Sequence, residues 1–179
     1  MLSRPADDTA AAAPAARRSG GNRDRAAAQD GVTVVEDRRL APGDAAGGRP
    51  QPDPEQVAVE IGAYGGTPFT FSCDVQDAGA IETAVANVFE RFGKIDALVN
   101  NAGITRDRSL AKMSPEEWDA VIQTNLTSVF QMTSRVLPHM VEAGYGRIVN
   151  ISSVIGVHGN FGQANYAAGN AFMDALARE

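Results

Sequence analysis

The chain has 179 residues, of which 44% are apolar, and a formal net charge of −6 at pH 7. This length supports one domain with a hydrophobic core and is too short for two domains of ordinary size. The whole acidic excess lies after residue 54. Such a charge balance gives no reason to expect nucleic acid or an anionic membrane as a partner.

The few cysteines and histidines and the lack of long apolar runs exclude several kinds of protein. Cys73 is the only cysteine, so no intrachain disulfide can form and a reducing compartment is expected. His139 and His158 do not combine with it into a metal-binding spacing. No apolar run approaches the roughly 20 residues that cross a bilayer. We therefore predict a cytoplasmic protein with no metal site and no membrane span.

The first 30 residues differ in composition from the rest. They are rich in Ala, Arg and Gly and hold almost no large apolar residue, so burial cannot offset the entropy of ordering them. The sequence predicts a disordered tail at 1–30 and one domain at 31–179.

From residue 31 onwards, strand patterns alternate with helix patterns. The first strand, "GVTVVE" (31–36), leads through a Pro/Gly-rich loop to a short helix within 55–66. A second strand follows in "PFTFSCDV" (68–75), and apolar spacing then predicts an amphipathic helix over 81–92 that ends at Gly93.

The second half repeats this pattern. "IDALVN" (95–100) predicts a third strand, and one long helix follows from Ser114, with Pro115 in its first turn and Glu117 completing a capping box. "GRIVNIS" (146–152) predicts a fourth strand, and the last helix starts near Gln163. This alternation predicts an α/β fold, a Rossmann-like doubly wound parallel sheet.

In such sheets, ligands bind beyond the carboxyl ends of the strands. There the sequence places "NNAG" (100–103) after the third strand, and Ser152 and Ser153 after the fourth. Tyr166 follows thirteen residues after Ser153. The amides and the glycine suit a flat ligand, and the two hydroxyls suit a carbonyl oxygen. Taken singly, these residues are equally typical of tight turns and helix caps.

Four segments in this order resemble the short-chain dehydrogenase/reductase family: "NNAGITRD" (100–107), "MSPEEWDAVIQTNLTSVF" (113–130), "GRIVNISSVIG" (146–156) and "GQANYAA" (162–168). Within that family they are most similar to the reductases of β-ketoacyl thioesters. The resemblance implies reduction of a small-molecule thioester, on acyl-carrier protein or CoA, with NADP or NAD as cofactor.

The resemblance also implies a role for each matching residue. Ser153 orients the substrate carbonyl, Tyr166 is the general acid that also meets the cofactor, and Asn125 holds a proton-relay water. The remaining matches surround the cofactor, namely Asp74 and the adjoining Val75 near the adenine, and Asn100, Ala102 and Gly103 in the turn beneath it. After the first strand, Asp37 would favour NAD by binding a ribose hydroxyl, whereas Arg38 or Arg39 would favour NADP by meeting a 2′-phosphate. The sequence leaves this choice open.

The sequence departs from the family pattern in three places. Asn170 stands where the family has a lysine four residues after the tyrosine, and the chain's two lysines lie elsewhere, at Lys94 and Lys112. The Gly-rich phosphate-binding motif that opens the family fold is missing, and the chain stops at Glu179, inside the helix of Tyr166. We therefore expect a truncated domain.

These departures keep three interpretations open. The first is a ketoreductase of fatty-acid metabolism whose own competence is in doubt. The second is a non-catalytic remnant that binds relatives, or its own copies, through the helix at 114–139. The third is a fragment that results from an incorrect gene model.

Overall fold

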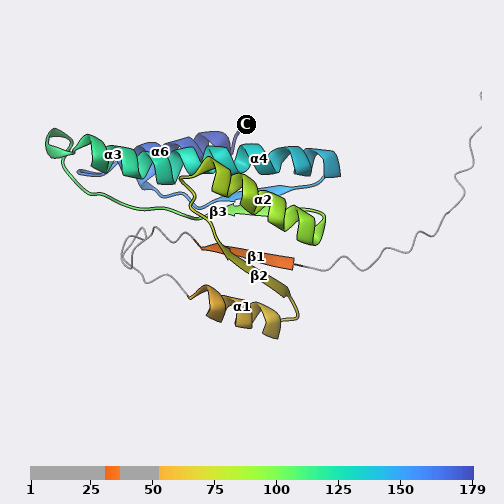
Figure 1. Cartoon of the computed structure of the whole chain (residues 1–179). Helices are drawn as coiled ribbons and strands as arrows, with labels where there is room; N and C mark the ends of the chain where they lie inside the picture. The colour runs from red at the N-terminus through yellow and green to blue at the C-terminus, as the bar shows by residue number, and fades with distance from the viewer. Residues whose placement is uncertain (1–30, 37–52) are drawn as a thin grey trace, which may run out of the picture.

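The computed structural model describes residues 31–36 and 53–179, with strands and helices alternating along the chain (Figure 1). The tail predicted to be disordered, residues 1–30, lies outside the described residues, as does the segment 37–52. The strands are β1 (Gly31–Glu36), β2 (Thr67–Ser72), β3 (Ala97–Asn100) and β4 (Arg147–Asn150). The helical segments are α1 (Pro54–Ala63), α2 (Ala78–Phe92), η1 (Leu110–Lys112), α3 (Pro115–Ile122), η2 (Gln123–Thr127), α4 (Ser128–Ala143), α5 (Ile155–His158) and α6 (Ala164–Leu176).

Local signals explain where the helices begin and end. The Ser114 hydroxyl accepts the Glu117 N–H at 3.2 Å, and the Glu117 carboxylate accepts the Ser114 N–H at 3.0 Å, which confirms the predicted capping box. Helix α2 begins three residues before the predicted start, after Asp77, whose carboxylate accepts the Gly79 N–H at 2.8 Å. It ends, as predicted, at Gly93, whose φ of 70° favours glycine.

The long helix predicted from Ser114 is interrupted. A π turn, η2, separates α3 from α4, and the Ser128 N–H reaches back five residues to the Gln123 carbonyl. Two hydroxyls bond carbonyls in the same stretch: Thr124 Oγ1 donates to the Ala120 carbonyl at 2.9 Å, and Ser128 Oγ donates to the Thr124 carbonyl. The sequence pattern did not indicate this interruption.

The four strands form two parallel pairs, β1 with β2 and β3 with β4. The alternation and the parallel pairing confirm the predicted α/β architecture. Among the described residues, however, no strand hydrogen bonds join the two pairs into one sheet. A strand bonds only a neighbour about 4.8 Å away, and the described residues supply no strand between β1 and β3. Helices α2, α3, α4 and α6 lie on one side of the strands, and α1 covers the other side of β1 and β2 (Figure 1).

The hydrophobic core lies between the strands and the α2–α4 layer. One cluster joins Cys73 to Ile81 and Ala84, and a second joins Val85 to Val136 and Met140. Leu98 of β3 and Ile148 of β4 pack against the second cluster. Side chains of a strand alternate between its two faces, so their sequence neighbours point away from this core.

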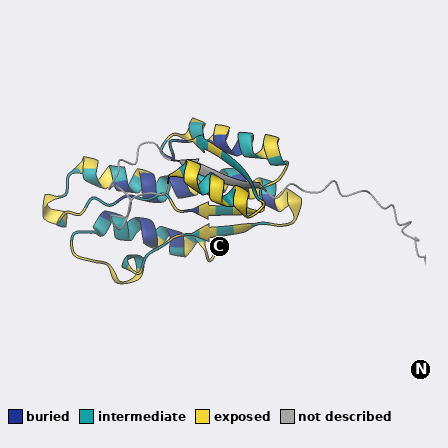
Figure 2. Cartoon of the chain, turned by 90° about the horizontal axis from the view of Figure 1, so that it is seen from below, coloured by how far each residue is buried: buried dark blue, intermediate teal, exposed yellow. Residues whose placement is uncertain are grey.

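Those neighbours form an uncovered apolar face. Val99 is 57% exposed, Val149 is 45% exposed and Ile151 is 51% exposed. Figure 2, seen from the side of α1, shows exposed residues along both strands. The β3–β4 pair therefore has one face packed against helices and one face that no described residue covers.

Candidate active site

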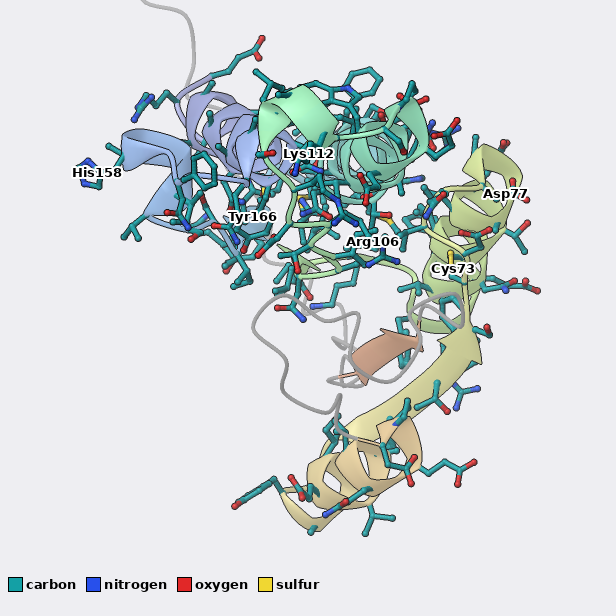
Figure 3. All side chains as sticks on the ribbon, turned by 90° about the vertical axis from the view of Figure 1, so that its left-hand side faces the viewer. Cys73, Asp77, Arg106, Lys112, His158 and Tyr166 are labelled. Atoms are coloured by element: carbon teal, nitrogen blue, oxygen red, sulfur yellow. The ribbon has the colours of Figure 1, made fainter. Side chains whose placement is uncertain are left out.

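The residues expected to act together come from three strand ends and one helix start. Asp74 and Val75 follow β2, Asn100 ends β3, Ser153 follows β4, and Tyr166 lies in the first turn of α6. Figure 3 looks onto this end of the molecule, where Cys73, Arg106 and Tyr166 mark the segments after β2, after β3 and in α6. The parallel fold thus gathers the predicted residues at one edge, as the doubly wound arrangement requires.

Asn100 is turned into the protein. Its Nδ2 donates to Asn150 Oδ1 at 2.8 Å and to Thr133 Oγ1 at 3.2 Å, and its side chain is buried. The amide therefore ties β3 to β4 and to α4. The surface of the turn is left to the exposed Asn101 and the half-buried Ala102 and Gly103, whose small size keeps the backbone accessible.

Asn125 sits in the π turn and holds the end of the "NNAG" turn. Its Oδ1 accepts the Ile104 N–H at 2.9 Å, and its Nδ2 donates to the Ile104 carbonyl at 2.9 Å. Helix α6 approaches the same residue through Gly169, where an added Cβ would lie 2.9 Å from the Asn125 Cβ. The buried Asn125 side chain therefore bonds the end of the β3 turn, and α6 packs closely against it.

Ser153 has its hydroxyl oriented by the backbone. The Ile155 N–H donates to Ser153 Oγ at 3.3 Å, so the hydroxyl proton is left to donate elsewhere. Helix α5 follows at once and packs closely on α6: a Cβ added at Gly156 would lie 2.8 Å from the Asn170 Cβ. This close packing fixes the segment after Ser153 against the helix that carries Tyr166.

Asp74 and Val75 lie beside the π turn. Asp74 Oδ1 accepts the Gln76 N–H at 2.9 Å, and the Gln76 amide donates to Thr124 Oγ1 at 2.9 Å. Val75 is buried. The loop after β2 is thereby tied to the helix that bears Asn125, which brings the predicted adenine-side residues to the same edge. Asp37 and Arg38, the residues predicted to select the cofactor, lie outside the described residues.

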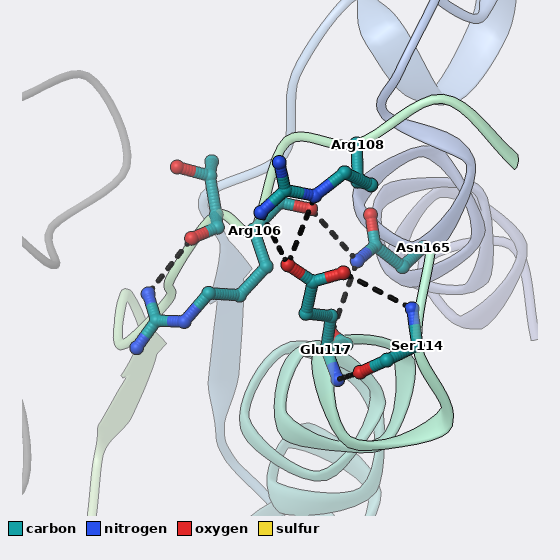
Figure 4. Close-up of polar contacts among 6 residues, drawn as sticks. Arg106, Arg108, Ser114, Glu117 and Asn165 are labelled. Carbon is teal, nitrogen blue, oxygen red and sulfur yellow. Dashed lines mark hydrogen bonds and ion pairs between the residues drawn. The ribbon is translucent and has the colours of Figure 1, made fainter. Parts of the chain in front are cut away.

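A further polar cluster is built around the predicted capping box, and the sequence did not indicate that Arg108 and Asn165 join it (Figure 4). Arg108 donates to one Glu117 carboxylate oxygen through Nε at 3.1 Å and Nη2 at 2.9 Å. These bonds, with that of the Ser114 N–H, hold the pKa of Glu117 below its usual range. The Asn165 amide lies beside them and bonds the carbonyls of Arg106 and Glu117, both at 3.2 Å. For Asn165 the only sequence signal was its place next to the tyrosine, which alone indicates nothing.

A family model described as short chain dehydrogenase matches residues 45–179. The match includes the β3 turn, the helix of Asn125 and the helix of Tyr166. The chain belongs to the short-chain dehydrogenase family.

Curated relatives agree with this assignment. The chain is 42% identical to the 3-oxoacyl-(acyl-carrier-protein) reductase of Thermotoga maritima, over 84% of this chain and 57% of that protein. It is 47% identical to nodulation protein G of Azospirillum brasilense, over 72% and 55% of the two chains. It is 48% identical to the corresponding Salmonella typhimurium reductase, over 59% and 45%. The chain therefore spans about half the length of these relatives.

Asn170 replaces the lysine that the dehydrogenase pattern leads us to expect, and the structure shows what it does instead. It is 1% exposed, and its Nδ2 donates to the Tyr166 carbonyl at 2.8 Å. Its amide thus faces the backbone of its own helix. The chain's two lysines lie on other elements: Lys94 pairs with Asp96 at 2.8 Å, and Lys112 ends η1.

The described residues fit a nicotinamide cofactor of this family in part. The turn at 101–103 offers small side chains and amide chemistry for a flat ring. Helix α2, which follows β2 at this edge, begins after Asp77, whose carboxylate already caps it and would repel a phosphate. In the described part of the chain, no helix is long and apolar enough to cross a membrane, and no cluster of His, Cys, Asp and Glu could hold a metal.

Proposed function

We propose that this chain is an NAD(P)H-dependent reductase that converts β-ketoacyl thioesters, on acyl-carrier protein or CoA, to 3-hydroxyacyl thioesters in the cytoplasm. Two of the relatives are named as 3-oxoacyl-(acyl-carrier-protein) reductases, and the family match includes the segment of Ser153 and Tyr166. The observation that carries the proposal is the Ser153 hydroxyl, whose lone pair is engaged by the Ile155 N–H and whose proton is left for a carbonyl oxygen.

The reduction requires two donor side chains at the carbonyl oxygen, one for a proton and one for a hydrogen bond. When bound, NAD(P)H supplies the hydride for the carbonyl carbon. The carbonyl oxygen then gains negative charge, and Tyr166 donates its proton to that oxygen while Ser153 donates a hydrogen bond. Both interactions are stronger with the developing alkoxide than with the ketone, so they lower the barrier.

We propose a role for Asn125 beside the one that the family implies. Both ends of its amide bond Ile104, so we propose that its side chain acts by holding the β3 turn in place. A proton-relay water would have to be held by the backbone of the π turn. Cofactor choice between NADP and NAD remains with Asp37 and Arg38.

Two titrations and one assay test the proposal. NADPH and NADH are titrated separately into the purified chain by calorimetry, and acetoacetyl-CoA is supplied while NADPH absorbance is followed. Saturable micromolar binding with turnover supports the proposal. Tyr166→Phe is expected to lower kcat by about 10²–10⁴, whereas the matched variant Tyr145→Phe, at an exposed ring after α4, leaves it unchanged. Equal rates for the two variants would contradict the role of Tyr166.

One observation favours a second candidate, a member of the family without turnover. Asn170 carries no charge and bonds the Tyr166 carbonyl, so α6 supplies no cation to the phenol as the family lysine does. We expect acetoacetyl-CoA reduction at least about a thousandfold slower than that of a relative with the lysine. We also expect Asn170→Lys alone not to restore it, because the new side chain would enter a buried place against Gly156. Full recovery in that variant would refute this reasoning.

We propose that copies of the chain associate through the segment 114–139, extended to the end of α4. Phe130, Leu137 and Val141 lie along one exposed stripe of α4, spaced by seven and four residues. Sedimentation of Leu137→Glu is expected to show the loss of a dimer that Val59→Glu, on the exposed side of α1, retains. A monomeric wild-type chain would overturn this proposal.

A further inference from the structure

Two buried asparagines hold the Tyr166 peptide from both sides. Asn165 Oδ1 accepts the Tyr166 N–H at 2.8 Å, and Asn170 Nδ2 donates to the Tyr166 carbonyl at 2.8 Å. Asn165 is 0% exposed and Asn170 is 1% exposed. A backbone unit whose two polar groups both bond buried amides has little freedom to shift or tilt.

Asn165 uses its whole amide to link three segments. While Oδ1 accepts the Tyr166 N–H, Nδ2 donates to the Arg106 carbonyl in the loop after β3 and to the Glu117 carbonyl in the first turn of α3. A primary amide has two N–H donors, and both are used. The start of α6 is therefore fixed relative to the loop after β3 and to α3.

The segments that Asn165 joins are themselves braced (Figure 4). Arg108 bonds the Glu117 carboxylate through two nitrogens, and the Arg108 N–H donates to the Gly162 carbonyl at 2.8 Å. Gln163 donates to Asp107 Oδ2 at 3.0 Å. The loop before α6 is thus held to the loop after β3 at three separate points, of which only the Asn165 amide is fully buried.

Asn170 works from the other side of the tyrosine, one helical turn later. Its bond to the Tyr166 carbonyl is additional to the helical bond at that position, so its loss leaves no bare carbonyl. Its own carbonyl accepts the Ser152 hydroxyl at 3.3 Å, which ties α6 to the strand end that precedes Ser153. Asn170, which replaces the family lysine, therefore holds the Tyr166 backbone in place, whereas the lysine would bring a positive charge.

We infer that Asn165 and Asn170 are positioning residues for Tyr166, and that they set where its phenol stands relative to Ser153 at the carboxyl edge. The inference rests on the proposed function only for what the phenol does there. The clamp acts through the Tyr166 backbone, so its removal moves the ring without touching a substrate or a cofactor.

The experiment uses the three tyrosines of the chain, Tyr64, Tyr145 and Tyr166. Ring-labelled tyrosine gives three NMR signals, and Tyr166→Phe identifies the one that belongs to Tyr166. Tyr64 and Tyr145 are exposed and lie on other segments, so they report general changes in the same sample. Asn165→Ala is the main variant. Asn160→Ala is the matched control, because Asn160 is an exposed asparagine of the same loop that bonds only Gln163.

We expect Asn165→Ala to displace the Tyr166 signal while Tyr64 and Tyr145 stay in place, and Asn160→Ala to displace none of the three. A Tyr166 signal that coincides with that of the wild type, in a folded Asn165→Ala chain, overturns the inference. If that variant does not fold, as judged by Trp118 fluorescence, Asn170→Ala decides in the same way, because it leaves no bare carbonyl.

A kinetic readout separates positioning from simple loss of stability. If the wild type turns over acetoacetyl-CoA, Asn165→Ala is expected to lower kcat by about 10–100-fold with little change in KM, since small misplacements of a reacting group are costly. An unchanged kcat in the folded variant overturns the inference. A wild type without turnover contradicts the proposed function alone, because the NMR comparison needs no reaction.

Discussion

Helices α1 and α3 begin with the same local signal, a capping side chain followed by a proline, but they differ in burial. Asp53 and Pro54 start α1, where the Asp53 carboxylate accepts the Glu55 N–H at 3.0 Å, and Ser114 and Pro115 start α3. Yet α1 has no buried residue, whereas α3 buries Val121 completely. A cap specifies where a helix begins and says nothing about what will cover it.

The same contrast extends to the two halves of the molecule. The β1–β2–α1 unit, residues 31–36 and 53–72, packs mainly on itself. Among residues 53–179, whose burial is described, every buried residue lies between Cys73 and Met173. The second part, residues 73–179, has polar clamps at Asn125 and Asn165 as well as two apolar clusters. Regular secondary structure is thus present in both parts, but α1 and β2 have no buried residue, whereas the second part has the burial that makes a segment resistant to opening.

Hydrogen exchange should show the largest difference between the two parts. Amides in the middle of α4, near Val136, are expected to exchange at least about a thousandfold more slowly than those of α1, because core elements open only at a large fraction of the global unfolding free energy. Mass spectrometry of peptides from both helices measures the ratio. Similar exchange rates would mean that the β1–β2–α1 unit opens together with the rest of the chain.

A pair of truncations sharpens the comparison. Ile81→Ala removes a fully buried side chain from the first core cluster and is expected to lower the free energy of unfolding by about 2–5 kcal/mol. Val59→Ala removes a β-branched side chain from α1 that is 72% exposed, and should change it by less than about 0.5 kcal/mol. Urea titrations of both variants provide the values. Equal decreases in the free energy of unfolding for the two variants would mean that Val59 is buried in solution.

The polar clamp at the π turn can be tested by a nearly isosteric change. Asn125→Leu leaves the Ile104 N–H and carbonyl without their buried partner, at an expected cost of about 2 kcal/mol. The matched variant Asn160→Leu, in an exposed loop, should stay within about 0.5 kcal/mol of the wild type. A neutral Asn125→Leu would mean that water or another group satisfies Ile104.

The smallest expected effect is the loss of thermal stability at low pH through protonation of Glu117. Hydrogen bonds from Arg108 and from the Ser114 N–H lower the pKa of Glu117 from its ordinary value of 4.5. The folded state favours the ionised Glu117 carboxylate, so this carboxylate stabilises the fold fully above its ordinary pKa of 4.5. That stabilisation is lost as the pH falls through the lowered pKa of the folded state. Glu117→Gln should therefore show a shallower decline of Tm between about pH 7 and about pH 3. Curves that fall in parallel, with Glu142→Gln as the exposed control, would contradict this.

The place of the candidate site in the fold was predictable from the sequence, but the contacts of its side chains were not. Strand ends and the family-like segments pointed to Ser153 and Tyr166, and the fold brings their segments to one edge. Nothing in the sequence indicated that the Asn100 amide turns inwards, or that Asn165 binds two carbonyls more than forty residues away in the sequence. Hydrogen-bond partners at such separations depend on how helices approach one another, which no local pattern encodes.

The sequence by itself determined the order of strands and helices, the capping box at Ser114, the α/β class and the resemblance to short-chain dehydrogenases, because these follow from local propensities and short motifs. Tertiary structure decided three other things: the π turn in the long helix, the separation of the strands into two pairs, and the conversion of Asn170 from a missing lysine into a clamp on Tyr166. The π turn and the Asn170 bond join groups that are only five and four residues apart, and the strand pairs are separated by the spacing of whole elements. In each case the packing of the surrounding helices and strands selects the arrangement, and no local pattern encodes that packing.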